Sequence, residues 1–179
     1  MKKTLLCLGF VTFLLSCNND KDKAATTGTT MDSTAKTMAD LPYKASYSSS
    51  WSQDVSDADL KTVLMTYKDW SDGNISGLTS RMADSIAVDM YTGDHMWSSR
   101  ADLAKFWTNF RDSLSSVKID MQSWQKMYST DKKESYILTW YDETDTYKTG
   151  KVDSATYHDI NQVKDGKITW YSTYKRPKK

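Results

Sequence analysis

The sequence predicts an α+β domain in which three helices cover one face of a curved antiparallel sheet. Apolar residues recur at helical spacing in three segments, as far as Leu114. Beyond that point, four segments rich in Tyr, Trp, Val, Ile and Thr alternate in part between apolar and polar residues, and short polar turns separate them. Helices followed by a run of strands are typical of an α+β layer fold.

The first predicted helix begins after Ser56 and ends at Asp72-Gly73-Asn74. Ser56 lies three residues before Asp59, which is the spacing of a capping box with an acidic partner. Glycine at position 73 suits the left-handed conformation with which many helices end. A short second helix is predicted over Ile75 to Met82.

A strand is predicted from Ser85 to Tyr91, and a loop leads from it to the third helix. Ser99 lies three residues before Asp102, and the apolar residues beyond it form one stripe, which predicts a buried helix face. That stripe consists of Leu103, Phe106, Trp107, Phe110 and Leu114. The four later strands are predicted over residues 117–128, 135–147, 154–164 and 167–175, and Asp165-Gly166 is a strong hairpin signal between the last two.

The N-terminus has the features of a bacterial lipoprotein signal. Lys2 and Lys3 precede an apolar run from Leu5 to Leu15, which is shorter than the roughly 20 apolar residues of a membrane-spanning helix. The run ends in Leu14-Leu15-Ser16-Cys17, which resembles the lipobox, whose cysteine carries the lipid. The sequence therefore predicts a signal peptide over residues 1–16, a lipidated Cys17, and a cell-envelope protein anchored to a membrane on its periplasmic face or at the cell surface.

Composition divides the rest of the chain into two parts. Residues 17–50 are polar and lack helix or strand periodicity, which predicts a disordered tether that follows the lipidated cysteine. Residues 51–179 contain all seven tryptophans and are expected to form one domain. Removal of residues 1–16 leaves 22 basic residues (24 minus Lys2 and Lys3) against 23 acidic residues, which argues against a nucleic-acid binder.

Neither a metal nor a cofactor is expected. Once the signal peptide is removed and Cys17 is acylated, no thiol is left for a disulfide or a metal site, and the chain has only two histidines. The sequence has no phosphate-binding loop and no dinucleotide fingerprint.

Three stretches share their order and spacing with the motifs of one superfamily. Residues 67–78 (YKDWSDGNISGL) look like its helix, "n-x-G-D" turn and second helix, with Asn74 where Asp is usual. Residues 82–88 (MADSIAV) look like the entry into its first strand, and residues 158–168 (HDINQVKDGKI) look like its last hairpin. The chain thus resembles the nuclear transport factor 2-like superfamily, with its polyketide-cyclase-like (SnoaL-like) and ketosteroid-isomerase-like members. The resemblance implies a cone-shaped α+β barrel with a pocket between sheet and helices, and frequently a homodimer through the sheet.

Asp159 is the first candidate for chemistry. If the last hairpin has the register of the family, Asp159, Asn161 and Val163 share the face that looks into the pocket, because side chains alternate along a strand. A slip of one residue would instead point His158 inward. In that pocket Asp159 is a candidate acid or base, and Asn161 a candidate for orienting a polar ligand.

The likeness to ketosteroid isomerase does not extend to that enzyme's three catalytic residues. Matched by motif, its catalytic base falls on Met90, which accepts no proton, and its tyrosine falls on Thr66, with Tyr67 one residue away. Only its second aspartate finds a counterpart, in Asp159. This specific reaction is therefore not expected.

His95 is a second candidate, in a loop that lies at the pocket mouth in many members of the superfamily. A solvated surface histidine is the alternative interpretation. The acidic cluster of Asp142, Glu143 and Asp145 lacks the spacing of a calcium loop and is interpreted as a solvated edge.

The tryptophans exceed what an ordinary core requires, so some are expected to line a pocket for a small apolar or aromatic ligand. The alternative is that they fill a cavity-free barrel or a dimer face. The candidate ligand-binding residues are Asp159, Asn161, Tyr67, Trp70, Met90, Trp97, Trp107 and Trp140.

Three functions remain open at this point. The first hypothesis is a non-catalytic, lipid-anchored domain that binds a small, largely apolar ligand. The second is a general acid–base enzyme, isomerase-like or cyclase-like, that uses Asp159 or His95, and the third is a protein-interaction or dimerisation module. A deep pocket with two convergent ionisable groups would favour the enzyme, an apolar pocket without them would favour the binding domain, and a filled barrel would favour the interaction module.

Overall fold

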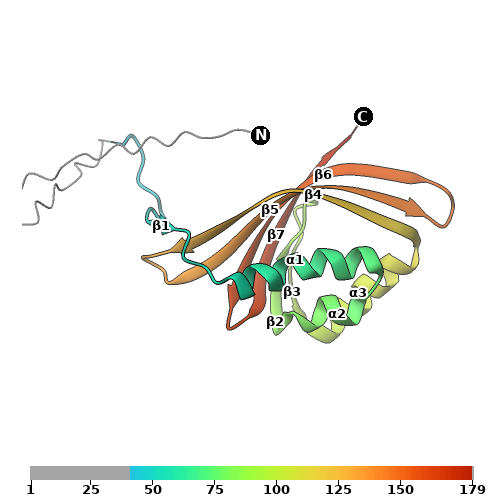
Figure 1. Ribbon diagram of the computed structural model, residues 1–179, viewed down its shortest axis with the longest axis horizontal. Coiled ribbons are helices and arrows are strands. Elements are labelled where there is room, and N and C mark those ends of the chain that lie inside the picture. Colours follow the sequence, from blue (N-terminus) through green and yellow to red (C-terminus); the bar gives the residue numbers. More distant parts are fainter. Residues whose placement is uncertain (1–40, 179) are drawn as a thin grey trace, which may run out of the picture. The chain divides into compact units, whose positions relative to one another are not determined.

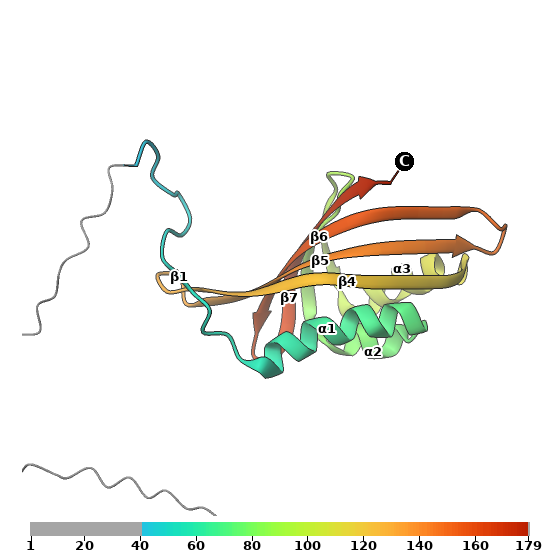
Figure 2. The same cartoon turned by 45° about the horizontal axis from the view of Figure 1, so that its top comes forward.

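The computed structural model describes residues 41–178, which form three helices and a sheet of seven strands. The helices are α1 (Asp57–Asp72), α2 (Ile75–Ser80) and α3 (Arg100–Asp112). The strands are β1 (Trp51–Ser52), β2 (Met82–Asp89), β3 (His95–Ser99), β4 (Leu114–Ser129), β5 (Glu134–Tyr147), β6 (Val152–Lys164) and β7 (Lys167–Pro177). All three helices lie on one side of the sheet (Figures 1 and 2). The α+β fold class expected from the sequence is confirmed.

The sheet is mixed, whereas the sequence predicted an antiparallel one. Its strand order is β1-β4-β5-β6-β7-β2-β3, and every pair is antiparallel except β2 with β7, which run parallel. A parallel pair needs a long connection between its strands, and residues 90–166 supply it. Hairpins join the successive strands from β4 to β7, so these strands are necessarily antiparallel.

Bulges give the long strands their bend. The pairing of β4 with β5 shifts register between Leu114 and Ser116, and again between Met121 and Ser123. An extra residue in one strand of a pair bends that strand and increases its twist. The resulting curvature of the sheet is visible in Figure 2.

The helix caps form where the sequence predicts them. The Ser56 hydroxyl accepts a hydrogen bond from the Asp59 amide at 3.0 Å, and the Ser99 hydroxyl accepts one from the Asp102 amide at 3.1 Å. Gly73 ends α1 in the left-handed region, with φ of 75°. The second helix ends at Ser80, because Met82 already belongs to β2.

The short strand β1 was not predicted, and two further elements differ from the prediction. Residues His95–Ser99, expected in a loop, form the edge strand β3, which pairs with β2. The apolar stripe of α3 is only partly in the core: Leu103 is buried, whereas Phe106 and Phe110 are 44% and 37% exposed. The other core side chains between helices and sheet include Val63, Ile86, Val88, Ile137 and Ile168.

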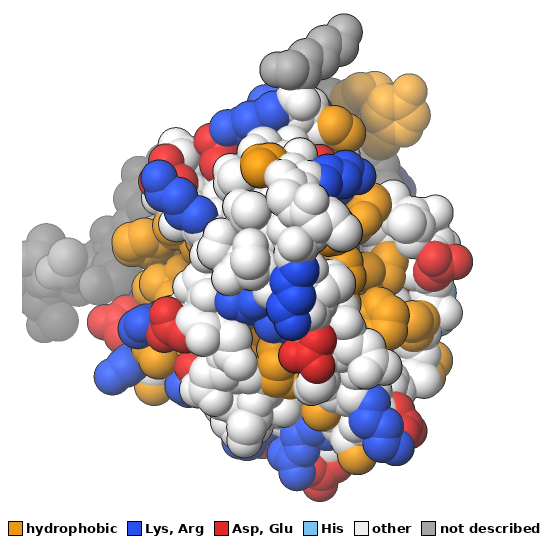
Figure 3. Space-filling model, turned by 90° about the vertical axis from the view of Figure 1, so that its right-hand side faces the viewer, with side chains coloured by type: hydrophobic (Ala, Val, Ile, Leu, Met, Phe, Trp, Pro, Cys, Tyr) orange, Lys and Arg blue, Asp and Glu red, His pale blue; other side chains and the backbone are white. Residues whose placement is uncertain are grey.

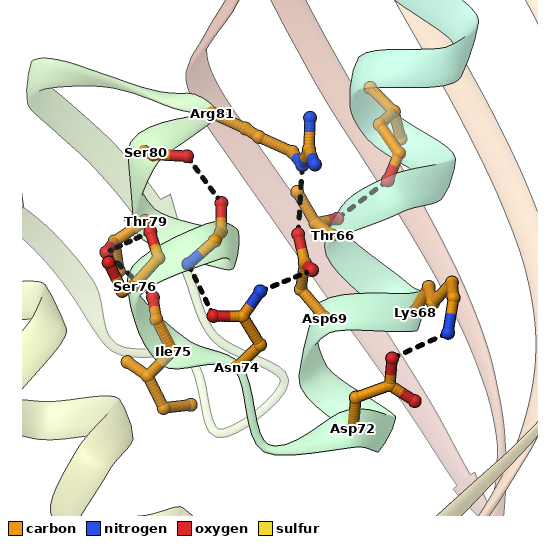
Figure 4. Close-up of polar contacts among 12 residues, drawn as sticks. Thr66, Lys68, Asp69, Asp72, Asn74, Ile75, Ser76, Thr79, Ser80 and Arg81 are labelled. Atoms are coloured by element: carbon orange, nitrogen blue, oxygen red, sulfur yellow. Dashed lines mark hydrogen bonds and ion pairs between the residues drawn. The ribbon is translucent and has the colours of Figure 1, made fainter.

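A buried carboxylate fastens α1 to α2 and to the start of β2. Asp69 accepts hydrogen bonds from the Asn74 amide at 2.9 Å and from Nε of Arg81 at 3.0 Å (Figure 4). The other end of the Asn74 side chain caps α2, since its oxygen accepts the Gly77 amide hydrogen at 3.0 Å. Asn74 therefore does the capping at the position where the superfamily usually has Asp.

Contact with the sheet begins before residue 51, at which the sequence placed the start of the domain. The Tyr47 hydroxyl is hydrogen-bonded to that of Tyr136 at 2.7 Å, and the Ser48 hydroxyl donates to Asp131 at 2.5 Å. The described residues from Pro42 onward accordingly form one compact unit. The signal peptide over residues 1–16, Cys17 and most of the expected tether lie outside the described residues. Among the residues that are described, no helix is long and apolar enough to cross a membrane.

Gly77→Ala tests the Asp69 network. Alanine ordinarily stabilises a helix over glycine by about 1 kcal/mol. A Cβ at position 77, however, would lie 2.2 Å from Nδ2 of Asn74 and 2.8 Å from Oδ1 of Asp69. We therefore expect Gly77→Ala to lower the free energy of unfolding by about 1–3 kcal/mol in urea denaturation, because these hydrogen bonds are displaced. Ser76→Ala in the same helix is the control, and a stabilising Gly77→Ala would contradict the description of the network.

Candidate functional site

A cavity of about 430 Å³ lies between the helices and the sheet. Helices α1 and α3, the β2–β3 connection and the inward faces of β5, β6 and β7 contribute its walls. Aromatic rings dominate these walls: Tyr67, Trp70, Tyr91, Phe106, Trp107, Phe110, Tyr141, Tyr147, Tyr157 and Tyr171. The rings pack on one another; those of Trp70 and Trp107, for example, have centroids 5.5 Å apart in a T-shaped arrangement.

Strand alternation turns Asp159 into this cavity. In β6, Asp159 and Asn161 face the helices and are only 6% and 4% exposed. The preceding residue, His158, lies on the opposite face of the sheet, where its ring stacks on Trp140 with centroids 4.8 Å apart. The register of the last hairpin therefore places the carboxylate, and not the imidazole, inside.

Two tyrosines hold one oxygen of the Asp159 carboxylate. Tyr67 from α1 donates to Oδ2 at 2.9 Å, and Tyr141 from β5 donates to the same oxygen at 3.0 Å. The Tyr67 oxygen accepts in turn from the Asn161 amide at 3.3 Å and lies 2.7 Å from the Thr139 hydroxyl. Oδ1 of Asp159 is buried, and no donor meets hydrogen-bond geometry with it, although the Thr173 hydroxyl lies close enough to the carboxylate to lower its pKa. Oδ2 is thus fixed by two phenols, whereas Oδ1 is not fixed by a hydrogen bond.

Burial raises the pKa of Asp159 to about 6, against the opposing effect of the hydroxyls of Thr173, Tyr67 and Tyr141. The pKa values of Tyr67 and Tyr141 lie well above their ordinary value, because both hydroxyls are buried and the Asp159 charge is near. Both phenols therefore stay protonated at neutral pH and remain donors. Asp159 is ionised at pH 7 but is a stronger base than an ordinary aspartate.

A second pair of carboxyls lies further along β5. Glu143 and Asp145 occupy the same face of the strand as Tyr141 and are 9% and 5% exposed. Burial raises the pKa of both groups, and their mutual proximity raises that of Glu143 further. The interpretation of this acidic cluster as a solvated edge is wrong for these two residues. It holds for Asp142, which points to the other face and pairs with Lys178 at 2.5 Å.

A lysine is held at the same end of the cavity. Nζ of Lys175 forms an ion pair with Asp153 at 2.9 Å. It also lies over the rings of Tyr91 and Tyr157, at 5.2 and 5.6 Å from their centroids. This ammonium group is therefore enclosed by one carboxylate and two aromatic faces.

The structure brings six of the predicted ligand-binding residues to the cavity and leaves two elsewhere. Those at the cavity are Tyr67, Trp70, Met90, Trp107, Asp159 and Asn161. Trp97 is 72% exposed on the edge strand β3, and Trp140 lies on the opposite face of β5 because alternate side chains point to opposite faces. His95, the second catalytic candidate, does not line the cavity and instead hydrogen-bonds Asp89, which also accepts from the Trp170 indole at 2.8 Å.

Sequence reasoning missed Tyr141, Glu143, Asp145, Tyr157 and Tyr171 as cavity residues. The available signal was the period of two: positions 141, 143 and 145 of β5 share a face with the buried residues Ile137 and Thr139. Within residues 41–178, no cluster of three or more His, Cys, Asp or Glu side chains suited to a metal ion is found.

No protein-family model and no curated protein matches this sequence. Solved structures with the same fold do exist. A putative polyketide cyclase from Xanthomonas campestris pv. campestris has a TM-score of 0.53 and 19% identity, over 66% of this chain and 90% of that one. An NTF-2 like protein of unknown function from Burkholderia xenovorans has a TM-score of 0.52 and 12% identity, over 69% and 86% of the two chains.

A third structure is a hypothetical protein with a ketosteroid isomerase-like fold from Catenulispora acidiphila, in complex with trimethylamine. Its TM-score is 0.53 at 12% identity, over 64% of this chain and 84% of that one. These similarities show that the domain has the nuclear transport factor 2-like fold, as the sequence resemblance implied. A domain of this fold that contains a cavity is compatible with a ligand-binding or an enzymatic role.

The raised pKa of Asp159 predicts a pH-dependent stability. Protonated Asp159 is favoured in the folded state, so its stabilising effect is complete below pH 4 and is lost as the pH rises through about 6. The free energy of unfolding of Asp159→Asn relative to wild type should therefore increase by about 2 kcal/mol between pH 4 and pH 7. Urea denaturation at both pH values measures this difference. A difference independent of pH would show that Asp159 has an ordinary pKa.

Proposed function

We propose that this domain is a general acid–base enzyme that acts on a small, largely apolar molecule, with Asp159 as the proton acceptor. The observation that carries the proposal is the geometry of one side chain. Oδ2 of Asp159 is held by two tyrosine hydroxyls, while the buried Oδ1 faces the cavity without a partner. A buried polar atom without a partner in a pocket is costly for stability, which favours a functional reason for its presence.

The proton affinity of Asp159 suits this role. A general base works best when its pKa lies near the operating pH, and burial raises that of Asp159 to about 6. The tyrosines fix the orientation of the carboxylate, so that Oδ1 is the oxygen presented to the ligand. Little reorganisation is then needed when the proton moves.

Two hydrogen-bond donors in the same cavity are placed to stabilise a developing negative charge. The Tyr171 hydroxyl and the Trp107 indole N–H are buried and line the cavity. The two groups are neighbours, since the indole N–H lowers the pKa of Tyr171 as a hydrogen-bond donor, and the Tyr171 hydroxyl hydrogen has no acceptor among the described residues. The charge of Asp159 and, above all, burial raise the pKa of Tyr171, which keeps its proton available for donation. Donors aimed at a developing oxyanion are among the largest contributors to catalysis.

The reaction class that follows is proton abstraction next to a carbonyl group. Oδ1 of Asp159 accepts the proton from the carbon, and the bonding electrons move to the carbonyl oxygen. Tyr171 and Trp107 hydrogen-bond the resulting enolate. Where a C=C double bond is conjugated with the enolate, return of a proton from Asp159 to the far carbon of that bond shifts the double bond and gives an isomer. Because the Asp159 proton exchanges with solvent before it is returned, the isomer formed in D2O carries one deuterium. Ketosteroid isomerase uses a tyrosine and a protonated aspartate as its oxyanion donors, whereas this site would use Tyr171 and Trp107. Both arrangements place a carboxylate base opposite hydrogen-bond donors for the enolate oxygen.

The cavity also weighs against the other two hypotheses. A non-catalytic binding domain was expected to have an apolar pocket without convergent ionisable groups, whereas Asp159, Glu143 and Asp145 all line this one. An interaction module was expected to have a filled barrel. Neighbours of the same fold include a putative polyketide cyclase and a ketosteroid isomerase-like protein, which agrees with an enzyme, although fold alone does not determine activity.

Metabolite profiling in D2O tests the proposal with the full chain and extracts of its own host. Wild type should convert one metabolite into an isomer that carries deuterium at the exchanged carbon. Asp159→Asn should slow this conversion about 100-fold or more, because general base catalysis contributes that much. Asp84→Asn, a change at an exposed ion pair with Arg100, is the control. An unchanged rate in Asp159→Asn, or a ligand that is bound and released without deuterium, would rule out this function.

The lipid anchor is part of the same proposal. It is supported by the lipobox-like Leu14-Leu15-Ser16-Cys17 and by the polar residues after it, which suit a tether. Membrane attachment through Cys17 would place the enzyme at an envelope membrane. Separately, a homodimer through the sheet remains a prediction from the family resemblance.

Cys17→Ala tests the anchor. Wild-type chain expressed in a bacterial host should partition into the detergent phase of a Triton X-114 separation and show the mass of a lipid-modified cysteine. The variant should stay in the aqueous phase without that mass, and equal partitioning of the two would contradict lipidation at Cys17.

A further inference from the structure

The cavity has a second polar end that the proposed chemistry does not use. Glu143 and Asp145 lie four and six residues along β5 from Thr139, which is paired with Asp159. At about 3.4 Å per residue, this puts the Cα atom of Glu143 roughly 14 Å along the strand from the level of Asp159. A substrate that reaches Asp159 can therefore present a different functional group to this pair.

The charges that line the cavity are predominantly negative. One cationic side chain, Lys175, faces five carboxyls: Asp94, Glu143, Asp145, Asp153 and Asp159. Lys175 is paired with Asp153. Within the part of the chain that the structure describes, neither Glu143 nor Asp145 forms an ion pair.

Asp145 points a free oxygen into this space. Its Oδ1 is buried and receives no hydrogen bond, apart from the proton that the two neighbouring carboxyls can share. The nearby guanidinium of Arg111 is directed elsewhere, since it donates to the backbone carbonyls of Trp70, Ser71 and Leu114. Burial raises the pKa of Asp145 even though the charges of Lys175 and Arg111 lower it, and neither cation forms an ion pair with it. A cation supplied by the ligand in direct contact with the two carboxyls would therefore stabilise this pair.

The surrounding aromatic rings suit an organic cation. Trp70, Tyr147 and Tyr157 line the cavity together with Glu143 and Asp145. The protein's own Lys175 ammonium already rests against Tyr157 and Tyr91 at this end. Aromatic faces attract ammonium groups, and do so most strongly when water is excluded. An inorganic cation is less suited, because residues 41–178 contain no metal-binding cluster.

We infer that the ligand of this cavity carries a protonated amine, which binds between the Glu143–Asp145 carboxyls and the adjacent aromatic rings. This inference rests on the proposed function for the location of the reacting carbon at Asp159. It adds the substrate class: an elongated, largely apolar amine whose cationic end lies at β5, away from the base.

Matched ligands that differ only in charge test this inference on the full chain. Tryptamine, tryptophol and indole-3-acetate share one ring system and carry an ammonium, a hydroxyl and a carboxylate; phenethylamine, 2-phenylethanol and phenylacetate form a second series. Calorimetric titration at pH 7 should give at least tenfold tighter binding of the amine than of the alcohol in at least one series. The carboxylate should bind more weakly than the alcohol.

The double variant Glu143→Gln/Asp145→Asn identifies the site. It keeps the side-chain shapes and should lose the preference for the amine while binding the alcohol within about twofold of wild type. Asp84→Asn should keep the preference, and circular dichroism confirms that each variant is folded. If the double variant does not fold, Asp145→Asn alone should reduce the preference at least threefold, because the raised pKa of Glu143 leaves the charge of the pair mainly on Asp145 at pH 7.

Other outcomes overturn the inference. These are equal or tighter binding of the alcohol, an amine preference that survives the double variant, or no binding of any amine.

The result for Asp159→Asn separates the two proposals. An amine preference without any Asp159-dependent proton exchange would refute the enzyme and retain the amine site. Proton exchange on a neutral substrate alone would retain the enzyme and refute the amine site.

Discussion

The site depends on the hydrogen bonds through which Tyr67 joins helix α1 to the centre of the sheet. Its hydroxyl meets Asp159 of β6 at 2.9 Å and Thr139 of β5 at 2.7 Å, so one side chain bridges both layers. A carboxylate as buried as Asp159 is tolerated only with strong donors, and Tyr67 and Tyr141 are those donors. Tyr67 lies five residues before the end of α1, and the Gly73 cap with the Asp69 network fastens that end of the helix (Figure 4).

The cavity contrasts with the outer surface of the domain. On the face seen in Figure 3, Lys and Arg side chains alternate with Asp and Glu, so no single sign of charge dominates there. Inside, carboxyls outnumber the one lysine, and burial raises the pKa of Asp159, Glu143 and Asp145. Carboxyls in such positions lower stability at neutral pH, and natural proteins retain costly groups of this kind mainly at functional sites. The interior is accordingly where the function is to be sought.

Much of the fold follows from local rules that act over a few residues. Ser56, Gly73 and Ser99 mark helix ends through hydrogen bonds to near neighbours, and the Asp165-Gly166 turn specifies a hairpin in the same way. The parallel pairing of β2 with β7 depends on contact between segments far apart in the chain, which no local pattern encodes. The strand β3 was missed although it forms a local hairpin with β2, joined by residues 90–94. Asp159 was identifiable because strand alternation and a family motif agreed. Glu143 and Asp145 were missed because charged residues usually face solvent, so the period of two along β5 was given too little weight.

The central claim is that Asp159 is a buried base whose free oxygen faces the cavity. The most direct test is an NMR titration of the carboxyl carbons in protein labelled with ¹³C aspartate, with Asp159→Asn used to assign the resonance. The account predicts a titration of Asp159 with a pKa of about 6, which shifts when a ligand enters the cavity. A pKa at or below 4 that no ligand changes would show that Asp159 is an ordinary solvated carboxylate and would contradict the account.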